Sequence, residues 1–177
     1  MDRKVKGYTI MEILVIIAIL SILAGFAFVS FRNIVLNQRL KASTDNLVSV
    51  LNTARMYSMT GRDVRGIGPR PWGVYVTEDG RRFILFEDTN SNCRCDNNCN
   101  NGEEVVKTFQ MESGVKVRNP LVIVFDKKGY PRNAICGFGA TNIIIESETL
   151  NKARTICISR YGRIRVVEGE ITTCVEN

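Results

Sequence analysis

A long uncharged, mostly apolar run near the N-terminus, Ile13–Phe31, limits what this chain can fold into. Its length is close to the ~20 residues that an α-helix needs to span a bilayer. The basic residues Arg3, Lys4 and Lys6 come before it, which favours a cytoplasmic start for the helix. A carboxylate, Glu12, directly precedes the run, where an ionisable residue indicates a function. We therefore expect a single-pass membrane anchor with a functional carboxylate.

The small residue that a leader peptidase requires lies before this run. An ordinary secretory signal carries its small-residue cleavage site after the apolar segment, whereas Gly7 precedes it. A cut after Gly7 would leave the apolar helix on the mature protein, headed by the amine of Tyr8. Glu12 would then lie about one helical turn from that amine, so that it can neutralise its own N-terminus or that of a neighbouring copy.

The stretch Lys6-Gly7-Tyr8-Thr9-Ile10-Met11-Glu12 resembles the processing site of type IV prepilins, with a glycine, an aromatic residue and a glutamate at mature position five. The resemblance implies that a prepilin peptidase removes residues 1–7 and that the new amine of Tyr8 is methylated. It implies Glu12 as the assembly charge. The usual phenylalanine is replaced by Tyr8. An uncleaved signal anchor with a chance glutamate is the alternative.

The same resemblance implies a location and partners. The chain would first lie in the inner membrane with its head outside the cytoplasm. It would then enter a pilus or pseudopilus, in the periplasm or at the cell surface, beside other pilins or minor pilins.

Helical periodicity continues past the apolar run. Proline and glycine are absent from Asn33 to Met59, and Gly61 is a stop signal. We predict one long helix, with residues 8–32 as its transmembrane or filament-core half and 33–61 as its amphipathic half. The apolar positions that recur at helical spacing in the second half are Leu40, Leu47, Val50, Leu51, Ala54 and Tyr57.

From residue 62 onward, short β-rich runs alternate with turn residues. The clearest pair, Trp72–Thr77 and Arg82–Glu87, flanks the turn Glu78-Asp79-Gly80. This spacing predicts an antiparallel β-sheet head over 62–177 that packs on the helix, an α+β architecture that matches the pilin fold. The other predicted strands are Val105–Gln110, Val115–Arg118, Leu121–Phe125, Ile143–Ser147, Ala153–Ser159 and Arg163–Val167.

Short motifs in the head resemble, in order, those of the FimT/GspH group of minor pilins and pseudopilins. They are Ala54-Arg55 with Gly61-Arg62-Asp63-Val64, Asp88-Thr89-Asn90-Ser91-Asn92 with Gly102-Glu103, and Ser159-Arg160-Tyr161-Gly162-Arg163-Ile164-Arg165. The resemblance implies a subunit at or near a filament tip and not an enzyme. Histidine is absent from the sequence, which excludes Ser-His-Asp and Cys-His nucleophile pairs.

Six cysteines are expected to form disulfides, because the head should lie in an oxidising compartment. A zinc site would need four converging ligands, and the local cluster in the Asn-rich loop 87–104 supplies three. Since three cysteines lie in this loop and three in the C-terminal half, full pairing requires at least one bridge between them. The connectivity is left open. The cysteines are Cys93, Cys95, Cys99, Cys136, Cys157 and Cys174.

The same loop carries oxygen ligands at alternate positions. Asp88, Asn90 and Asn92 match positions one, three and five of a calcium loop, and Asp96 and Glu103 add further oxygens. Cysteines stand where an EF-hand has its glycine and its last glutamate. We favour a polar loop stapled by disulfides, with no cofactor, and keep calcium as the alternative.

A basic segment near the C-terminus, Gly162-Arg163-Ile164-Arg165, is the candidate binding site. Strand alternation would put Arg163 and Arg165 on one face with Ile164 inward. The formal net charge of +6 permits an anionic partner. The preceding segment adds further cations, Lys152, Arg154 and Arg160, and we expect Lys127, Lys128 and Arg132 nearby.

FimT-like minor pilins of natural transformation carry a C-terminal GRxR motif that contacts DNA. The resemblance therefore implies a minor type IV pilin that binds DNA for uptake. The alternatives are a GspH-like pseudopilin of type II secretion and a structural priming minor pilin without DNA binding.

Overall fold

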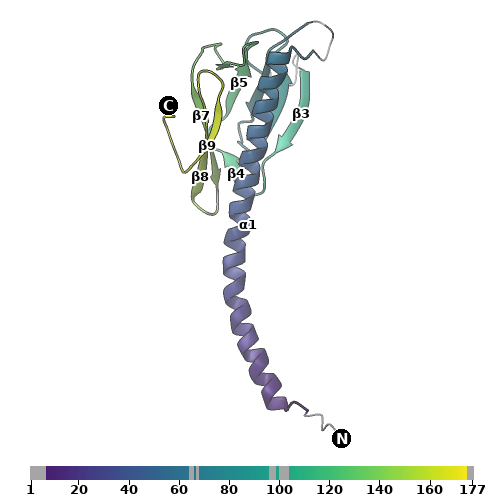
Figure 1. Ribbon diagram of the computed structural model, residues 1–177, viewed down its shortest axis with the longest axis vertical. Coiled ribbons are helices and arrows are strands. Elements are labelled where there is room, and N and C mark those ends of the chain that lie inside the picture. Colours follow the sequence, from purple (N-terminus) through teal and green to yellow (C-terminus); the bar gives the residue numbers. More distant parts are fainter. Residues whose placement is uncertain (1–6, 64–65, 67, 96–98, 100–103, 175–177) are drawn as a thin grey trace, which may run out of the picture. The chain divides into compact units, whose positions relative to one another are not determined.

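The structure is a computed structural model in which a helix, α1 (Ile10–Thr60), is followed by antiparallel strands (Figure 1). The chain divides into two compact units, Met1–Val35 and Leu36–Asn177. The first holds the N-terminal part of α1, and the second holds the rest of α1 with the β-rich head. The residues described are 7–63, 66, 68–95, 99 and 104–174, without the side chains of 26–30 and 104.

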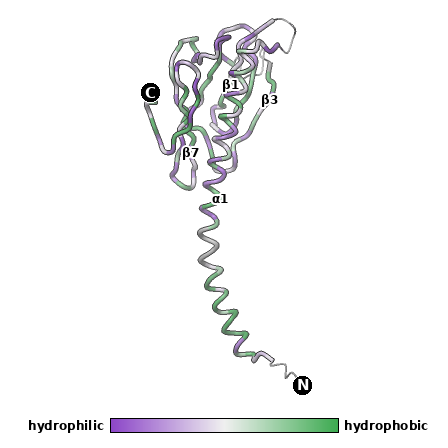
Figure 2. The backbone as a smooth tube through the Cα atoms, in the orientation of Figure 1, coloured by the Kyte–Doolittle hydropathy of each residue, from purple (hydrophilic) through white to green (hydrophobic). Residues whose placement is uncertain are grey.

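Apolar residues follow one another along the first part of α1, as the hydropathy colouring of the backbone shows (Figure 2). Large apolar residues are exposed here, among them Ile10, Leu14 and Leu20. Within the part of the chain that the structure describes, we find no helix with a sufficiently long and apolar stretch to cross a bilayer. The predicted segment Ile13–Phe31 includes 26–30, whose side chains lie outside that part.

α1 ends at the predicted stop. Gly61 has a φ of +67°, and the N–H of Arg62 donates to the carbonyl of Tyr57 at 3.0 Å, which is the long bond of a Schellman cap. Trp72 then ties the helix end to the first strand. Its N–H donates to Ser58 Oγ at 2.8 Å and its Nε1 donates to the carbonyl of Arg62 at 3.0 Å.

Two antiparallel sheets form the head, as the strand pattern predicts. The first contains, in spatial order, β3 (Glu104–Gln110), β2 (Arg82–Glu87), β1 (Trp72–Val76), β5 (Leu121–Phe125) and β6 (Pro131–Arg132). The second contains β4 (Val115–Val117), β7 (Thr141–Ser147), β8 (Lys152–Ile158) and β9 (Ile164–Glu168). Each predicted strand is found to within two residues at either end. β6 was not predicted, because a two-residue strand is too short to show alternation.

The β1–β2 turn joins the two sheets. Gly80 has a φ of +66°, and its carbonyl accepts the N–H of Val117 in β4 at 2.8 Å. A Cβ at Gly80 would lie 2.1 Å from the carbonyl oxygen of Val117. Only glycine fits both the backbone conformation and this approach.

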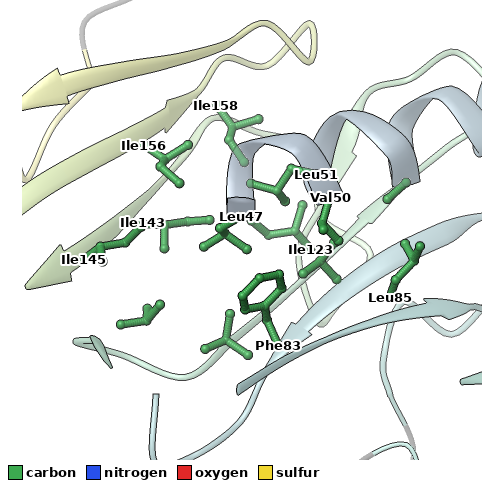
Figure 3. Close-up of a cluster of buried hydrophobic side chains, with 14 of the residues drawn as sticks. Leu47, Val50, Leu51, Phe83, Leu85, Ile123, Ile143, Ile145, Ile156 and Ile158 are labelled. Atoms are coloured by element: carbon green, nitrogen blue, oxygen red, sulfur yellow. The ribbon is translucent and has the colours of Figure 1, made fainter. Parts of the chain in front are cut away.

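One hydrophobic core joins the helix to both sheets (Figure 3). Leu47 and Leu51 of α1 are fully buried between Phe83 of the first sheet and Ile143 and Ile156 of the second. The predicted apolar stripe of the helix is confirmed. Leu40, Leu47, Val50, Leu51 and Ala54 are buried, and Tyr57 packs against them.

Three disulfides pair all six cysteines: Cys93–Cys136, Cys95–Cys99 and Cys157–Cys174. Their Cα–Cα distances are 5.3, 4.9 and 5.7 Å, within the usual range for a disulfide. The prediction of full pairing is confirmed. Cys93–Cys136 is the expected bridge between the Asn-rich loop and the C-terminal half.

The Cys157–Cys174 bridge fixes the segment after β9 against the second sheet. Thr155 and Cys157 lie on the face of β8 opposite to the core residue Ile156, because successive side chains alternate. The Thr155 hydroxyl donates to the carbonyl of Gly169 at 2.8 Å and accepts the N–H of Ile171 at 3.0 Å. The C-terminal segment therefore covers the part of the outer face around Thr155 and Cys157, which are both buried.

Removing this bridge should destabilise the protein measurably. The double variant Cys157→Ser/Cys174→Ser should lower the free energy of unfolding by about 3 kcal/mol, because it frees a loop with a sequence separation of 17. The matched variant Cys95→Ser/Cys99→Ser opens a separation of 4 and should cost about 2 kcal/mol. Urea unfolding of the detergent-solubilised chain gives both values. A larger loss in the second variant would contradict the assigned pairing.

Candidate functional site

The N-terminal turn of α1 is the first candidate site. Thr9 caps the helix: its Oγ1 accepts the N–H of Glu12 at 3.2 Å, and its carbonyl accepts the N–H groups of Glu12 and Ile13 at 3.1 and 3.2 Å. Gly7 and Tyr8 precede the helix, no atom lies within 4 Å of a Cβ built at Gly7, and Tyr8 is 77% exposed. Both residues of the predicted cleavage site therefore lie outside the helix, and their surroundings are open.

Thr9 is the N-cap of α1, which the sequence predictions did not include. Thr9 and Glu12 stand at the spacing of a capping box, T-x-x-E, and this signal was present in the sequence. Glu12 lies in the first turn of α1, where the helix dipole favours a carboxylate. Residues 1–6 of the predicted leader lie outside the described part, and the pairing of Glu12 with an amine stays a prediction.

The turn before β9 is the second candidate site. Ser159 organises it, because its carbonyl accepts the N–H of Gly162 at 2.9 Å and its Oγ accepts the N–H of Arg163 at 3.1 Å. Gly162 is buried and has a φ of +78°. A Cβ at Gly162 would lie 2.1 Å from the carbonyl oxygen of Gly129.

The carbonyl of Gly129 is a junction of three segments. It touches Gly162 and accepts a hydrogen bond from Nε of Arg55 at 3.2 Å. The helix motif Ala54-Arg55 and the C-terminal motif therefore meet at one carbonyl group. The positive φ of Gly162 and this close contact together require glycine at this position, without any ligand.

This contact brings two basic turns together. Lys127 and Lys128 precede Gly129, Arg160 and Arg163 flank Gly162, and all four are exposed. Lys127 and Lys128 were predicted to lie near the basic segment but were not assigned to the binding site, and 33 positions of sequence separate Gly129 from Gly162. The charge of these two lysines now adds to that of the C-terminal motif.

Asp126 offsets the charge of Arg132, the next cation along the chain after Lys128. Arg132 pairs with Asp126 at 2.8 Å. Partial burial raises the pKa of the Asp126 carboxyl, but the N–H of Tyr130 and the Arg132 guanidinium outweigh it, so this pKa lies below its ordinary value. Asp126 is thus ionised at neutral pH and offsets the charge of Arg132.

The structure separates two of the remaining predicted cations, Lys152 and Arg154, from the turn. Arg165 pairs across the strands with Cys157, so it lies on the outer face of the sheet. Lys152 and Arg154 lie on the opposite face, at the start of β8, roughly 20 Å of strand before Arg160. Arg154 is also held by Glu168 at 2.7 Å. The six predicted residues therefore form no single patch.

β9 begins one residue later than predicted, at Ile164. Arg163 thus belongs to the turn and not to the strand. Ile164 is half-buried and packs against the core, as the alternation indicates.

Three aromatic rings border the basic turns. The ring centroids of Tyr130 and Tyr161 lie 6.0 Å apart and those of Tyr130 and Phe138 lie 5.6 Å apart, both edge to face. Tyr130 and Phe138 come from different segments and carry no sequence pattern that could have identified them.

The Asn-rich loop uses its oxygens to hold its own backbone. The two carboxylate oxygens of buried Asp88 accept the N–H groups of Asn92 and Cys93 at 3.1 and 3.0 Å, and Asn90 Oδ1 also accepts the N–H of Asn92. Asp96 and Glu103 lie outside the described residues. Among those described, no three acidic or thiol ligands converge on a metal position. Calcium binding stays a prediction.

A depression of about 990 Å³ lies at the other end of the second sheet. The charged side chains that line it form ion pairs with one another. Lys116 lies 3.5 Å from Glu148, and Arg118 lies 2.9 Å from Glu146 and also pairs with Glu170. The hydrogen bond from Arg81 holds the pKa of Glu148 below its ordinary value. This region is a salt-bridge network.

Comparison with known proteins agrees with the N-terminal motif and with the fold. A family described as "Prokaryotic N-terminal methylation motif" matches residues 2–28. A solved structure, the minor pseudopilin EpsH from the Type 2 Secretion System of Vibrio cholerae, shares the fold with a TM-score of 0.52 at 11% sequence identity. The match covers 73% of this chain and 97% of that one. None of the curated proteins matches the sequence.

The junction at Gly129 makes a prediction about Gly162. Gly162→Ala should lower the free energy of unfolding by about 1–3 kcal/mol more than Gly169→Ala, because the new methyl group meets the Gly129 carbonyl. Gly169 has a φ of +91° and open space around it, so its substitution isolates the backbone strain, about 1–2 kcal/mol. Urea unfolding measures both. Equal losses would show that the close contact does not matter.

Proposed function

We propose that this chain, which is a type IV pilin-like protein by its methylation motif and its fold, is a minor type IV pilin that binds DNA at or near the pilus tip for natural transformation. The observation that carries the proposal is the meeting of two basic turns at the Gly129–Gly162 contact. It gathers four exposed cations, Lys127, Lys128, Arg160 and Arg163. Arg165 extends this surface onto the outer face of the second sheet.

Phosphate groups are the ligand that such a surface fits. The guanidinium of Arg163 offers a forked set of donors that matches a phosphate, and the lysines act as point charges. These cations would contact phosphates and not the edges of the bases. Binding should therefore be independent of sequence and strongly dependent on salt. Weak capture suits a subunit that relies on the filament for movement.

The methylation motif implies membrane anchoring before assembly. We assign residues 8–32 to the inner membrane or to the filament core, and the head to the periplasm or the cell surface. The three disulfides support this, because they persist in oxidising compartments. Other pilins would then cover the exposed apolar side chains of the N-terminal unit.

A GspH-like pseudopilin, or a priming minor pilin without DNA binding, is the second candidate. The fold shared with a minor pseudopilin supports it. The close packing of Gly162 supports it too, because that contact explains the motif glycine without any ligand. The two candidates differ in whether the head binds DNA.

Processing should remove residues 1–7. Mass spectrometry of the protein extracted from a host with prepilin peptidase should find an N-terminal Tyr8 that carries one methyl group. Gly7→Leu should block the cut, because the motif needs a small residue at that place. An intact Met1 in the unsubstituted protein, in cells that process other prepilins, would contradict the prediction.

DNA binding should depend on the basic turn and not on β8. Arg163→Ala/Arg165→Ala should weaken the binding of duplexes of different sequence about equally, and should reduce the salt slope by about 0.9 for each lost contact. Lys152→Ala is the matched control, because Lys152 is exposed but lies on the other face. Fluorescence anisotropy with the detergent-solubilised chain measures this, from an expected Kd of about 10⁻⁴–10⁻⁶ M.

Two outcomes would reject the site. If the unsubstituted chain shows no salt-dependent shift at low salt, the second candidate replaces the proposal. If the double variant binds as the unsubstituted chain does, or if Lys152→Ala weakens binding equally, the DNA surface lies elsewhere.

A further inference from the structure

The aromatic rings beside the basic turns form a second feature of the same surface. Tyr161 is 61% exposed and Phe138 is 46% exposed, with Tyr130 between them. Tyr130 and Phe138 also line a shallow depression together with Lys127 and Lys128. Large exposed rings are unusual on a head whose other aromatic residues, such as Phe83 and Phe125, are buried in the core.

Hydrogen bonds and a disulfide hold the loop that precedes Phe138. Phe138 follows a loop in which Asn133 Oδ1 accepts the N–H groups of Ile135 and Gly137 at 3.1 and 2.8 Å. Cys136 in this loop is bonded to Cys93. Arg132 lies over the Phe138 ring at 5.3 Å from its centroid. The ring therefore occupies a set position before any ligand arrives.

From this arrangement we infer that the surface binds single-stranded nucleic acid in preference to duplex, with unpaired bases stacked on Tyr161 and Phe138. The inference rests on the proposed DNA-binding function and adds the class of substrate. Aromatic side chains beside a basic groove are the recurring means of holding single strands, because every base offers a π-face. In a duplex the bases are stacked on one another, so the rings have nothing to contact.

The cations of the two turns supply the backbone contacts. Lys127 and Lys128 line the aromatic depression, and Arg160 and Arg163 flank the Tyr161 turn. A strand that lies across the rings would thus place its phosphates near charges on both sides. The same cations serve duplex DNA, whereas the rings serve only the single strand.

The test compares oligothymidylate with a duplex of the same length, using the detergent-solubilised full chain. Tyr161→Leu and Phe138→Leu keep an apolar side chain and remove the ring. Each should weaken oligothymidylate binding about fivefold or more and leave duplex binding within about twofold. Tyr161→Phe should bind as the unsubstituted chain does. Ile135→Ala is the matched control, because Ile135 is apolar, 76% exposed and in the same loop.

A spectroscopic variant gives an independent measurement. Phe138→Trp places an indole at the exposed ring position, and stacking of thymine on it should quench its emission with oligothymidylate but not with duplex. The buried Trp72 contributes a constant background. This measurement does not use the leucine variants, so a loss of stability in those variants would not affect it.

The outcomes separate the two proposals. If the unsubstituted chain binds neither probe, the proposed function fails and the inference fails with it. If it binds both probes equally and the leucine variants change neither, DNA binding stands and stacking is wrong. An equal loss on both probes, or a loss with Ile135→Ala, would also overturn stacking.

Discussion

The burial of one face of α1 between two sheets is the interaction on which the head depends. Leu47 and Leu51 have no exposed surface and contact both sheets through one core. Truncating a buried leucine costs about 2–5 kcal/mol, a large part of the 5–15 kcal/mol that stabilises a typical domain. Neither sheet can bury its inner face without the helix. The second half of α1 therefore serves as the central element of the head.

The carbonyl of Gly129 extends this dependence to the candidate site. Arg55 lies one residue after buried Ala54, so the position of its guanidinium follows from the packing of the helix. Gly162 rests on the same carbonyl. The core thus positions the basic turns through two contacts, the hydrogen bond from Arg55 to Gly129 and the packing of Gly162 on Gly129. A ligand on this surface would meet side chains whose backbones are fixed in advance, which reduces the entropy that binding has to overcome.

The disulfides fix segments of the head that lie outside the main core around α1. Cys93–Cys136 joins the Asn-rich loop to the loop that carries Phe138, and Cys157–Cys174 holds the C-terminal segment on the outer face of the second sheet. Each bridge joins a polar segment to a buried position: Cys93 lies in a second, smaller hydrophobic cluster with Phe86 and Val124, and Cys157 is buried in β8. The N-terminal unit is different, because large apolar side chains such as Ile10, Leu14 and Leu20 are exposed there.

The sequence by itself determined the secondary-structure elements and the N-terminal methylation motif. Local signals decide both: helical spacing for Leu40 to Tyr57, the stop at Gly61, strand alternation, and the short motif from Gly7 to Glu12. The tertiary structure alone decided which cysteines pair and which cations share a face. Lys152 and Arg154 are close to Arg160 along the chain, yet they lie on another face, whereas Lys127 and Lys128 are distant in sequence and adjacent in space. Such proximity is set by the packing of whole sheets, and no local sequence pattern in these segments indicates it.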